Sequence, residues 1–182
     1  ELHQLYEGLL KYRLLQQTTD NYVPVSLAVF GNMVISGMTG STDKTSATYF
    51  EDGADRLTYV AQAVLSRKFA SILSLTLAPS YVHRNHVAHM DMNNMFALGA
   101  AGRLKLSKRM GLLAEYYYPF RSQESKDYFR AQGVKFYNPL GLGLEIETGG
   151  HVFSITFTNS TAILENQFIP ETTSSWLQGQ FR

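Results

Sequence analysis

The chain has 182 residues, a formal net charge of +1 and no cysteine. The length fits a single domain over residues 1–182, the charge gives no reason to expect a nucleic-acid partner, and the missing cysteines exclude disulfides and thiolate metal sites. Charged residues make up 17% of the chain, below the roughly 25% of an ordinary soluble domain, whereas Tyr and Phe number 11 each. No run approaches the ~18 consecutive apolar residues of a spanning helix, so a membrane protein of this sequence has to be a β-barrel.

Apolar and polar residues alternate with a period of two in segments of about ten residues, the length of a strand that crosses a bilayer. For the first of these segments, residues 8–16, an amphipathic helix is the alternative to a strand. The predicted strands lie, in chain order, at 8–16, 22–36, 56–65, 72–83, 96–105, 112–118, 140–147, 153–158 and 176–181. Nine is an odd count, whereas bacterial barrels normally have an even one, so either one strand is misread or the chain is incomplete.

Short and long connections alternate between these strands. Short turns are predicted at 17–21, 66–69, 107–110 and 149–150, and long polar loops at 37–55, 84–94, 121–135 and 160–174. Outer-membrane barrels have this arrangement, with short turns on one rim and long extracellular loops on the other. Aromatic residues gather where strands meet the long loops and predict an interfacial girdle: Tyr81, Tyr116, Tyr118, Phe120 and Phe136.

The clearest hairpin covers residues 140–159. Gly149 and Gly150 are expected to take the two positive φ angles of a type I′ turn. A register centred on that pair predicts three apolar pairs on one face of the hairpin: Ile146 with Phe153, Leu144 with Ile155, and Leu142 with Phe157.

Alternation alone does not say which face of a barrel is inside. The polar set is mainly Ser, Thr, Ala, Gly and Gln with scattered charges, which suits a lumen better than a soluble surface dense in Lys and Glu. We therefore expect the charged residues to face the lumen: Lys11, Arg13, Arg103, Lys105, Glu115, Glu145 and Glu147. We expect the apolar set to face lipid and to be solvent-exposed in coordinates without lipid: Leu73, Leu75, Leu77, Leu142, Leu144, Phe153, Ile155 and Phe157. The alternative is a soluble, lipocalin-like ligand-binding barrel with this set inside.

The chain carries distinctive sequence blocks at 8–15, 67–69 with 73–75, 82–85, 114–118, 137–139, and 146–153 followed by 158–160, of which Glu-Thr-Gly-Gly-His-Val-Phe at 147–153 is the most specific. Together these blocks resemble an uncharacterised family of outer-membrane β-barrels from Bacteroidota. The resemblance spans nearly the whole chain, and its members typically carry a signal peptide, further strands before this region and a final strand after it. It therefore implies a barrel of about twelve strands that is truncated here at both ends, and it implies no activity.

The chemical constellations are weak. His83, His86, His89 and Asp91 lie within nine residues and include credible ligands for copper or zinc, but their spacing fits no standard site and a flexible loop does not preorganise ligands. We interpret them as part of a polar extracellular loop. Glu145 and Glu147 share a face, and we expect them to balance lumenal cations rather than to perform acid–base chemistry.

The sequence thus predicts an all-β, antiparallel, up-and-down transmembrane β-barrel in a bacterial outer membrane. We expect a passive pore, a small-solute transporter or an envelope scaffold, with lipid as a partner, no enzymatic activity and no cofactor. A five-residue connection at 107–111 would set Arg103 directly opposite Glu115, so these two side chains are expected to be lumenal neighbours.

Overall fold

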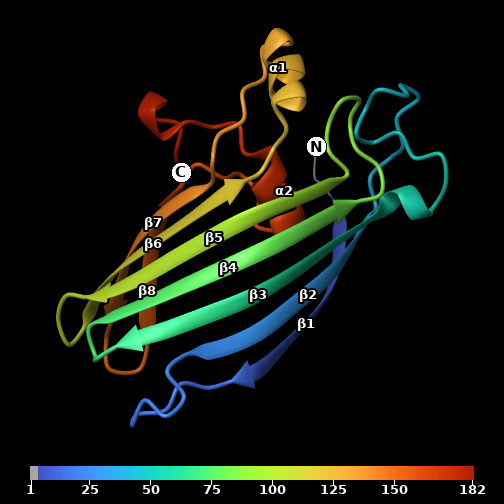
Figure 1. Ribbon diagram of the computed structural model, residues 1–182. Coiled ribbons are helices and arrows are strands. Elements are labelled where there is room, and N and C mark those ends of the chain that lie inside the picture. Colours follow the sequence, from blue (N-terminus) through green and yellow to red (C-terminus); the bar gives the residue numbers. More distant parts are fainter. Residues whose placement is uncertain (1–3) are drawn as a thin grey trace.

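The computed structural model describes residues 4–182, and its strands form one antiparallel sheet in the order of the sequence (Figure 1). The strands are β1 (Leu5–Leu15), β2 (Ser26–Ser36), β3 (Leu57–Phe69), β4 (Leu73–Arg84), β5 (Asn94–Lys105), β6 (Met110–Pro119), β7 (Leu140–Glu147) and β8 (Val152–Thr158). The described residues therefore contain eight strands, not the nine predicted. The first segment is a strand rather than a helix, whereas the last prediction is wrong, because Trp176–Gln178 is a 3-10 turn, η2.

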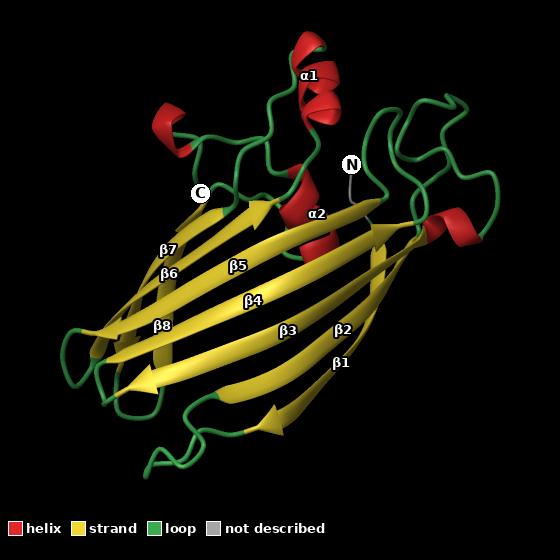
Figure 2. Cartoon of the chain, in the orientation of Figure 1, coloured by secondary structure: helices red, strands yellow, loops and turns green. Residues whose placement is uncertain are grey.

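The sheet is strongly curved, with a convex outer face and a concave inner face (Figure 2). The connections after β3, β5 and β7 are short and lie on one rim, which we call the short-turn rim; the connections after β2, β4 and β6 lie on the other, the long-loop rim. The short turn predicted at 17–21 is wrong, because β2 begins at Ser26 rather than at residue 22 and the connection after β1 covers residues 16–25. In residues 4–182, β1 and β8 do not pair with each other. The free edge of β8 has one reciprocal pair of backbone hydrogen bonds, between Thr158 and Arg182, with N···O distances of 2.9 and 3.0 Å.

Three of the long connections contain helices that the alternation pattern did not predict. These are η1 (Ala54–Arg56), α1 (Gln123–Ala131) and α2 (Glu165–Glu171). The hydroxyl of Ser122 caps α1 by accepting from the backbone N–H of Ser125 at 3.2 Å. Within residues 4–182 no helix has the length and apolar content to cross a membrane.

The apolar set faces outward, as predicted for a barrel in lipid. Six of the eight residues named for this test are exposed, with Phe153 at 58%, and the other two, Leu73 and Leu144, are half-buried. The core lies on the concave face instead. It is formed by Val60, Val82, Met95, Ala97, Tyr117 and Ile169. The soluble alternative required the eight apolar residues of the outward set to be packed inside the barrel, and the structure contradicts it.

The hairpin β7–β8 shows where the sequence was informative and where it was not. The β7–β8 register is confirmed at all three predicted pairs, including Ile146 opposite Phe153. The turn type is wrong, because only Gly149 has a positive φ, +70°, and the loop has four residues, 148–151. The short turn predicted at 66–69 is also wrong, because β3 continues to Phe69 and the turn follows it.

The predicted β5–β6 register is wrong by two residues. Arg103 lies opposite Leu113, and Glu115 lies opposite Ala101. The physical reason is a tighter turn: the hydroxyl of Ser107 accepts from the backbone N–H groups of Arg109 and Met110, at 3.2 and 3.1 Å. A shift of two residues leaves every side chain on its predicted face but changes its neighbour.

Candidate functional site

Helix α2 lies against the concave face near the long-loop rim, in contact with β3, β4 and β6 (Figure 1). We call it the plug helix. Ile169 is 1% exposed and belongs to the core cluster with Val60, Val82 and Met95. The ring of Phe168 packs edge-on against Tyr117, with 5.2 Å between ring centroids. The plug helix is therefore held by the same apolar core that the inward residues of β3–β6 create.

Polar contacts fix the first turn of the plug helix to β2 and β3. The amide nitrogen of Asn166 donates to the hydroxyl of Thr58 at 2.8 Å. The amide nitrogen of Asn32 donates to Glu7 at 2.6 Å and to Glu165 at 3.4 Å. Burial, with the nearby carboxylate of Glu7, raises the pKa of Glu165. These contacts set the rotation of the helix, which apolar packing alone leaves loosely defined.

A buried ionic cluster ties three long connections together, and we call it the latch. Asp91 accepts from both Arg84, at 2.9 Å, and Arg121, and Arg84 also reaches Glu171 at 2.8 Å. Arg121 donates to the backbone carbonyl of Pro170 at 2.6 Å, so the latch holds the end of the plug helix directly. Burial lowers the pKa of Arg121, against the opposing effect of the Asp91 carboxylate. Removal of the Asp91 carboxylate would leave buried guanidinium charge uncompensated, so the stability of the latch depends strongly on Asp91.

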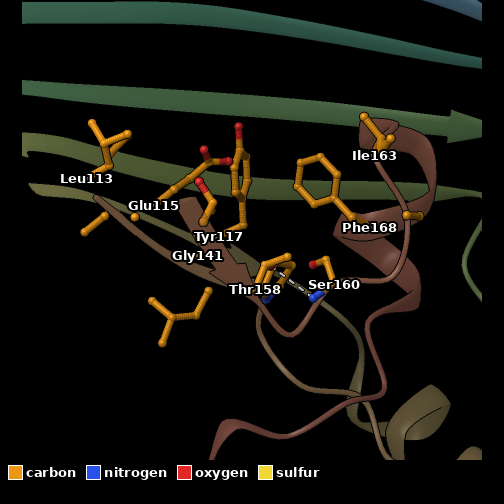
Figure 3. A pocket seen from close by; sticks show the side chains of 15 residues that line it. Leu113, Glu115, Tyr117, Gly141, Thr158, Ser160, Ile163 and Phe168 are labelled. Atoms are coloured by element: carbon orange, nitrogen blue, oxygen red, sulfur yellow. Dashed lines mark hydrogen bonds between the residues drawn. The ribbon is translucent and has the colours of Figure 1, made fainter. Parts of the chain in front are cut away.

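A pocket of about 340 Å³ lies on the concave face beside the plug helix (Figure 3). Strands β6–β8 and the segment before α2 line it, with Ile163 and Phe168 on one side and Glu115 and Tyr117 on the other. The ring of Tyr117 lies against the backbone of Gly99, where no side chain is in the way. A Cβ atom on residue 99 would lie 2.6 Å from the tyrosine ring. Glu115 is the charged side chain in the pocket wall, so the pocket favours a ligand with a polar or cationic part.

Toward the short-turn rim the concave face is less densely packed. Arg103 on β5 reaches Glu145 on β7, with its Nε 3.1 Å from Oε1 and a further contact through Nη2. The residue between them is Gly111 on β6, directly opposite Glu145, and a Cβ built on it would lie 3.6 Å from the Arg103 guanidinium. Because Gly111 has no side chain, the Arg103 side chain can extend across β6 to reach Glu145. Arg103 thus pairs with Glu145 rather than with the predicted Glu115.

The remaining charged residues predicted for the lumen lie on the concave side of their strands by register. Lys11 and Arg13 are opposite Phe30 and Ala28, which alternate with outward-facing neighbours on β2. Lys105 is opposite Gly111 on β6, and Glu147 lies two residues beyond Glu145 on β7.

The structure does not bring the four metal-ligand candidates together. A ring nitrogen of His83 is 2.7 Å from the side-chain amide oxygen of Asn94, and one of His86 is 2.9 Å from the backbone carbonyl oxygen of Ser46. His89 packs on Tyr128, and Asp91 is part of the latch. In the part of the chain that the structure describes, no group of three or more His, Cys, Asp or Glu side chains is placed to hold a metal ion.

Sequence reasoning missed the plug helix and both arginines of the latch. The sequence carries only a weak signal for the helix, because Leu164 and Phe168 have the i, i+4 spacing of one helix face but no longer apolar stripe follows. Arg84 and Arg121 carried no such signal, since each stands beside a long loop where a charged residue is ordinary.

Comparison with known proteins identifies a protein family but no characterised relative. The model of a family described as "Membrane bound beta barrel domain (DUF5777)" matches residues 1–182. No curated protein and no solved structure matches the chain.

Proposed function

The chain belongs to the family of membrane-bound β-barrel domains, and on that premise we propose that it forms the wall of a passive pore for small solutes in a bacterial outer membrane. The pattern of short turns on one rim and long loops on the other supports the outer membrane, where the long loops of such barrels are extracellular. The proposed role is transport without catalysis.

The contrast between the two faces of the sheet carries this proposal. The outer face exposes large apolar side chains, such as Leu77 and Phe157, which lipid would cover. The concave face carries charged groups, such as Glu115 and the Arg103–Glu145 pair, which need water or a polar solute beside them. A water-filled interior behind a lipid-facing wall is the arrangement of a pore.

The plug helix and the latch lie on the concave face at the long-loop rim, where a solute from outside would enter. They narrow that entrance, and the pocket beside them places Glu115 and Tyr117 next to the remaining space. We therefore expect small conductance steps and a preference for cations, because Glu115 adds negative charge to the constriction.

Planar-bilayer recording of the full-length protein tests this function. We expect stepwise conductance, and Glu115→Gln should reduce the cation preference. Glu124→Gln is the matched control, because Glu124 lies exposed on α1. Heat-modifiable gel migration shows that each variant is folded.

A folded protein without any conductance would contradict the pore. The plug helix and its latch would then close the interior permanently, which favours the second candidate, a structural protein of the envelope.

A further inference from the structure

Arg67 is a charged residue on the outer face of the sheet. It lies two residues before the end of β3 and opposite Leu75, which is exposed on the lipid side. Ser66 and Thr76 form the adjacent pair on the concave face, where their hydroxyl oxygens are 2.9 Å apart. Because successive residues of a strand point to opposite faces, Arg67 points outward.

The guanidinium of Arg67 lacks the partners that other arginines have. Arg84, Arg103 and Arg121 each bind a carboxylate. The Nε atom of Arg67 is buried and has no hydrogen-bond acceptor in the described residues, and its guanidinium lies 5.0 Å from the ring centroid of Phe69. A lipid-facing arginine is costly at the centre of a bilayer and tolerated near an interface. Its place beside the short-turn rim is consistent with the interface.

An apolar hollow begins at Arg67 and extends over the outer face of β4–β6. It has a volume of about 510 Å³. Its floor is formed where three small residues, Ala100, Gly102 and Ala114, meet on neighbouring strands. A second hollow of about 440 Å³ shares Gly102 and Ala114 with it and continues toward β7. The large side chains around this floor, including Leu75 and Leu77, form the walls.

We infer that this hollow binds one phospholipid of the surrounding membrane, with its phosphate on Arg67 and an acyl chain over Gly102. An arginine binds phosphate oxygens through two parallel N–H donors, and the apolar walls exclude water from the chain. The occupant is a membrane lipid because the family is membrane-bound and because the hollow joins an apolar surface to a single unpaired cation. This site does not depend on whether the concave face conducts.

Native mass spectrometry of the full-length protein, released from detergent after incubation with phosphatidylglycerol or phosphatidylethanolamine, tests the site. We expect one retained phospholipid. Arg67→Gln should weaken its retention at least tenfold, and Gly102→Leu, which fills the hollow but leaves the arginine, should weaken it similarly. Lys108→Gln is the matched control, because it removes the same charge from the turn after β5 on the same rim. If Gly102→Leu fails the gel-migration test for folding, Ala100→Leu replaces it.

Two further ligands identify the source of the phosphate. Diacylglycerol, which lacks phosphate, should bind the wild-type protein no better than phospholipid binds Arg67→Gln. Millimolar inorganic phosphate should not displace the bound phospholipid. Retention that is unchanged in both Arg67→Gln and the filled-hollow variant overturns the site. A loss in Arg67→Gln alone overturns it as well, because a headgroup contact would then exist without an acyl groove.

Discussion

The two ends of the concave face differ although the same strands build both. Near the long-loop rim the face is filled by a helix, an apolar core and a latch whose arginines are at most 7% exposed. Toward the short-turn rim it carries a partly exposed ion pair, Arg103–Glu145, and small residues such as Gly111. The sheet is thus continuous, whereas the groups that pack against its concave face lie at one end, so mutations at the two ends should differ in how much stability they cost.

The largest effect is expected from Asp91→Asn in the latch. Asp91 pairs with two buried arginines, although Arg84 also has Glu171 as a partner, and removing a partner from a buried ionic group costs about 3–5 kcal/mol. Urea unfolding in detergent measures the loss, and faster proteolysis of the long loops should accompany it. Asp127→Asn is the control, since its pair with Arg130 is solvent-exposed and should contribute less than about 1 kcal/mol. Equal losses from both substitutions would contradict the latch.

The next largest effect is expected from Ile169→Ala in the plug helix. Ile169 is fully buried, and truncating such a side chain costs about 2–5 kcal/mol. The truncation leaves a cavity between the plug helix and the sheet. Conductance in planar bilayers should therefore rise as stability falls. Leu177→Ala is the control: Leu177 lies on η2, away from the pocket, and is 99% exposed, and surface changes of this kind stay within about 0.5 kcal/mol. Unchanged conductance of the folded Ile169→Ala variant would show that the plug helix does not limit flow.

A smaller stability effect is expected at the open end. Glu145→Gln breaks the pair with Arg103, whose side chain is 40% exposed, so the free energy of unfolding should fall by less than about 1 kcal/mol. The uncompensated Arg103 should instead lower cation selectivity, measured as a shift in reversal potential. Glu147→Gln, which removes a neighbouring charge with no ion pair in the described residues, should change selectivity less. A stability loss as large as that of Asp91→Asn would erase the difference between the two ends.

The smallest effect is a pH dependence at the first turn of the plug helix. The pKa of Glu165 is raised in the folded protein above its ordinary 4.5 by burial and by Glu7. The protonated form is therefore favoured by folding. Its stabilising contribution is complete below about pH 4.5 and is lost as pH rises through the raised pKa. The protection of the plug-helix amides from hydrogen exchange, taken relative to their intrinsic exchange rates, should fall over that range. Glu165→Gln should flatten this profile of protection against pH. An unchanged profile in that variant would assign the pH dependence to another group.

The sequence predicted the wall well because a strand repeats every two residues and lipid requires one face to be apolar. Leu142, Leu144 and Ile146 show this, since their faces and their partners on β8 are both as predicted. The β5–β6 partner was wrong because hydrogen bonds from the backbone N–H groups of Arg109 and Met110 to the Ser107 hydroxyl, rather than the pattern, set the length of that turn. Alternation cannot distinguish registers that differ by two residues.

The plug helix and the latch on the concave face were harder to predict than the strands of the sheet. Arg84 and Asp91 are close in sequence, but Arg121 and Glu171 join them only once the sheet has curved. The seven-residue plug helix is too short for a strong periodic signal, and it contains Pro170, which argues against a helix when the sequence is read alone. Its position is set by contacts with distant strands, which no local pattern contains.

The polar anchors of the plug helix also predict an order of folding. Each strand pairs with its neighbour in sequence, so the sheet can grow one hairpin at a time. Asn166 bonds to Thr58 across 108 positions of the chain, and Glu165 bonds to Asn32 across 133. Contacts of such long sequence separation form late, because the intervening chain must be ordered first. The wall should therefore assemble with an empty interior, and the helix that narrows it should be the last element to arrive.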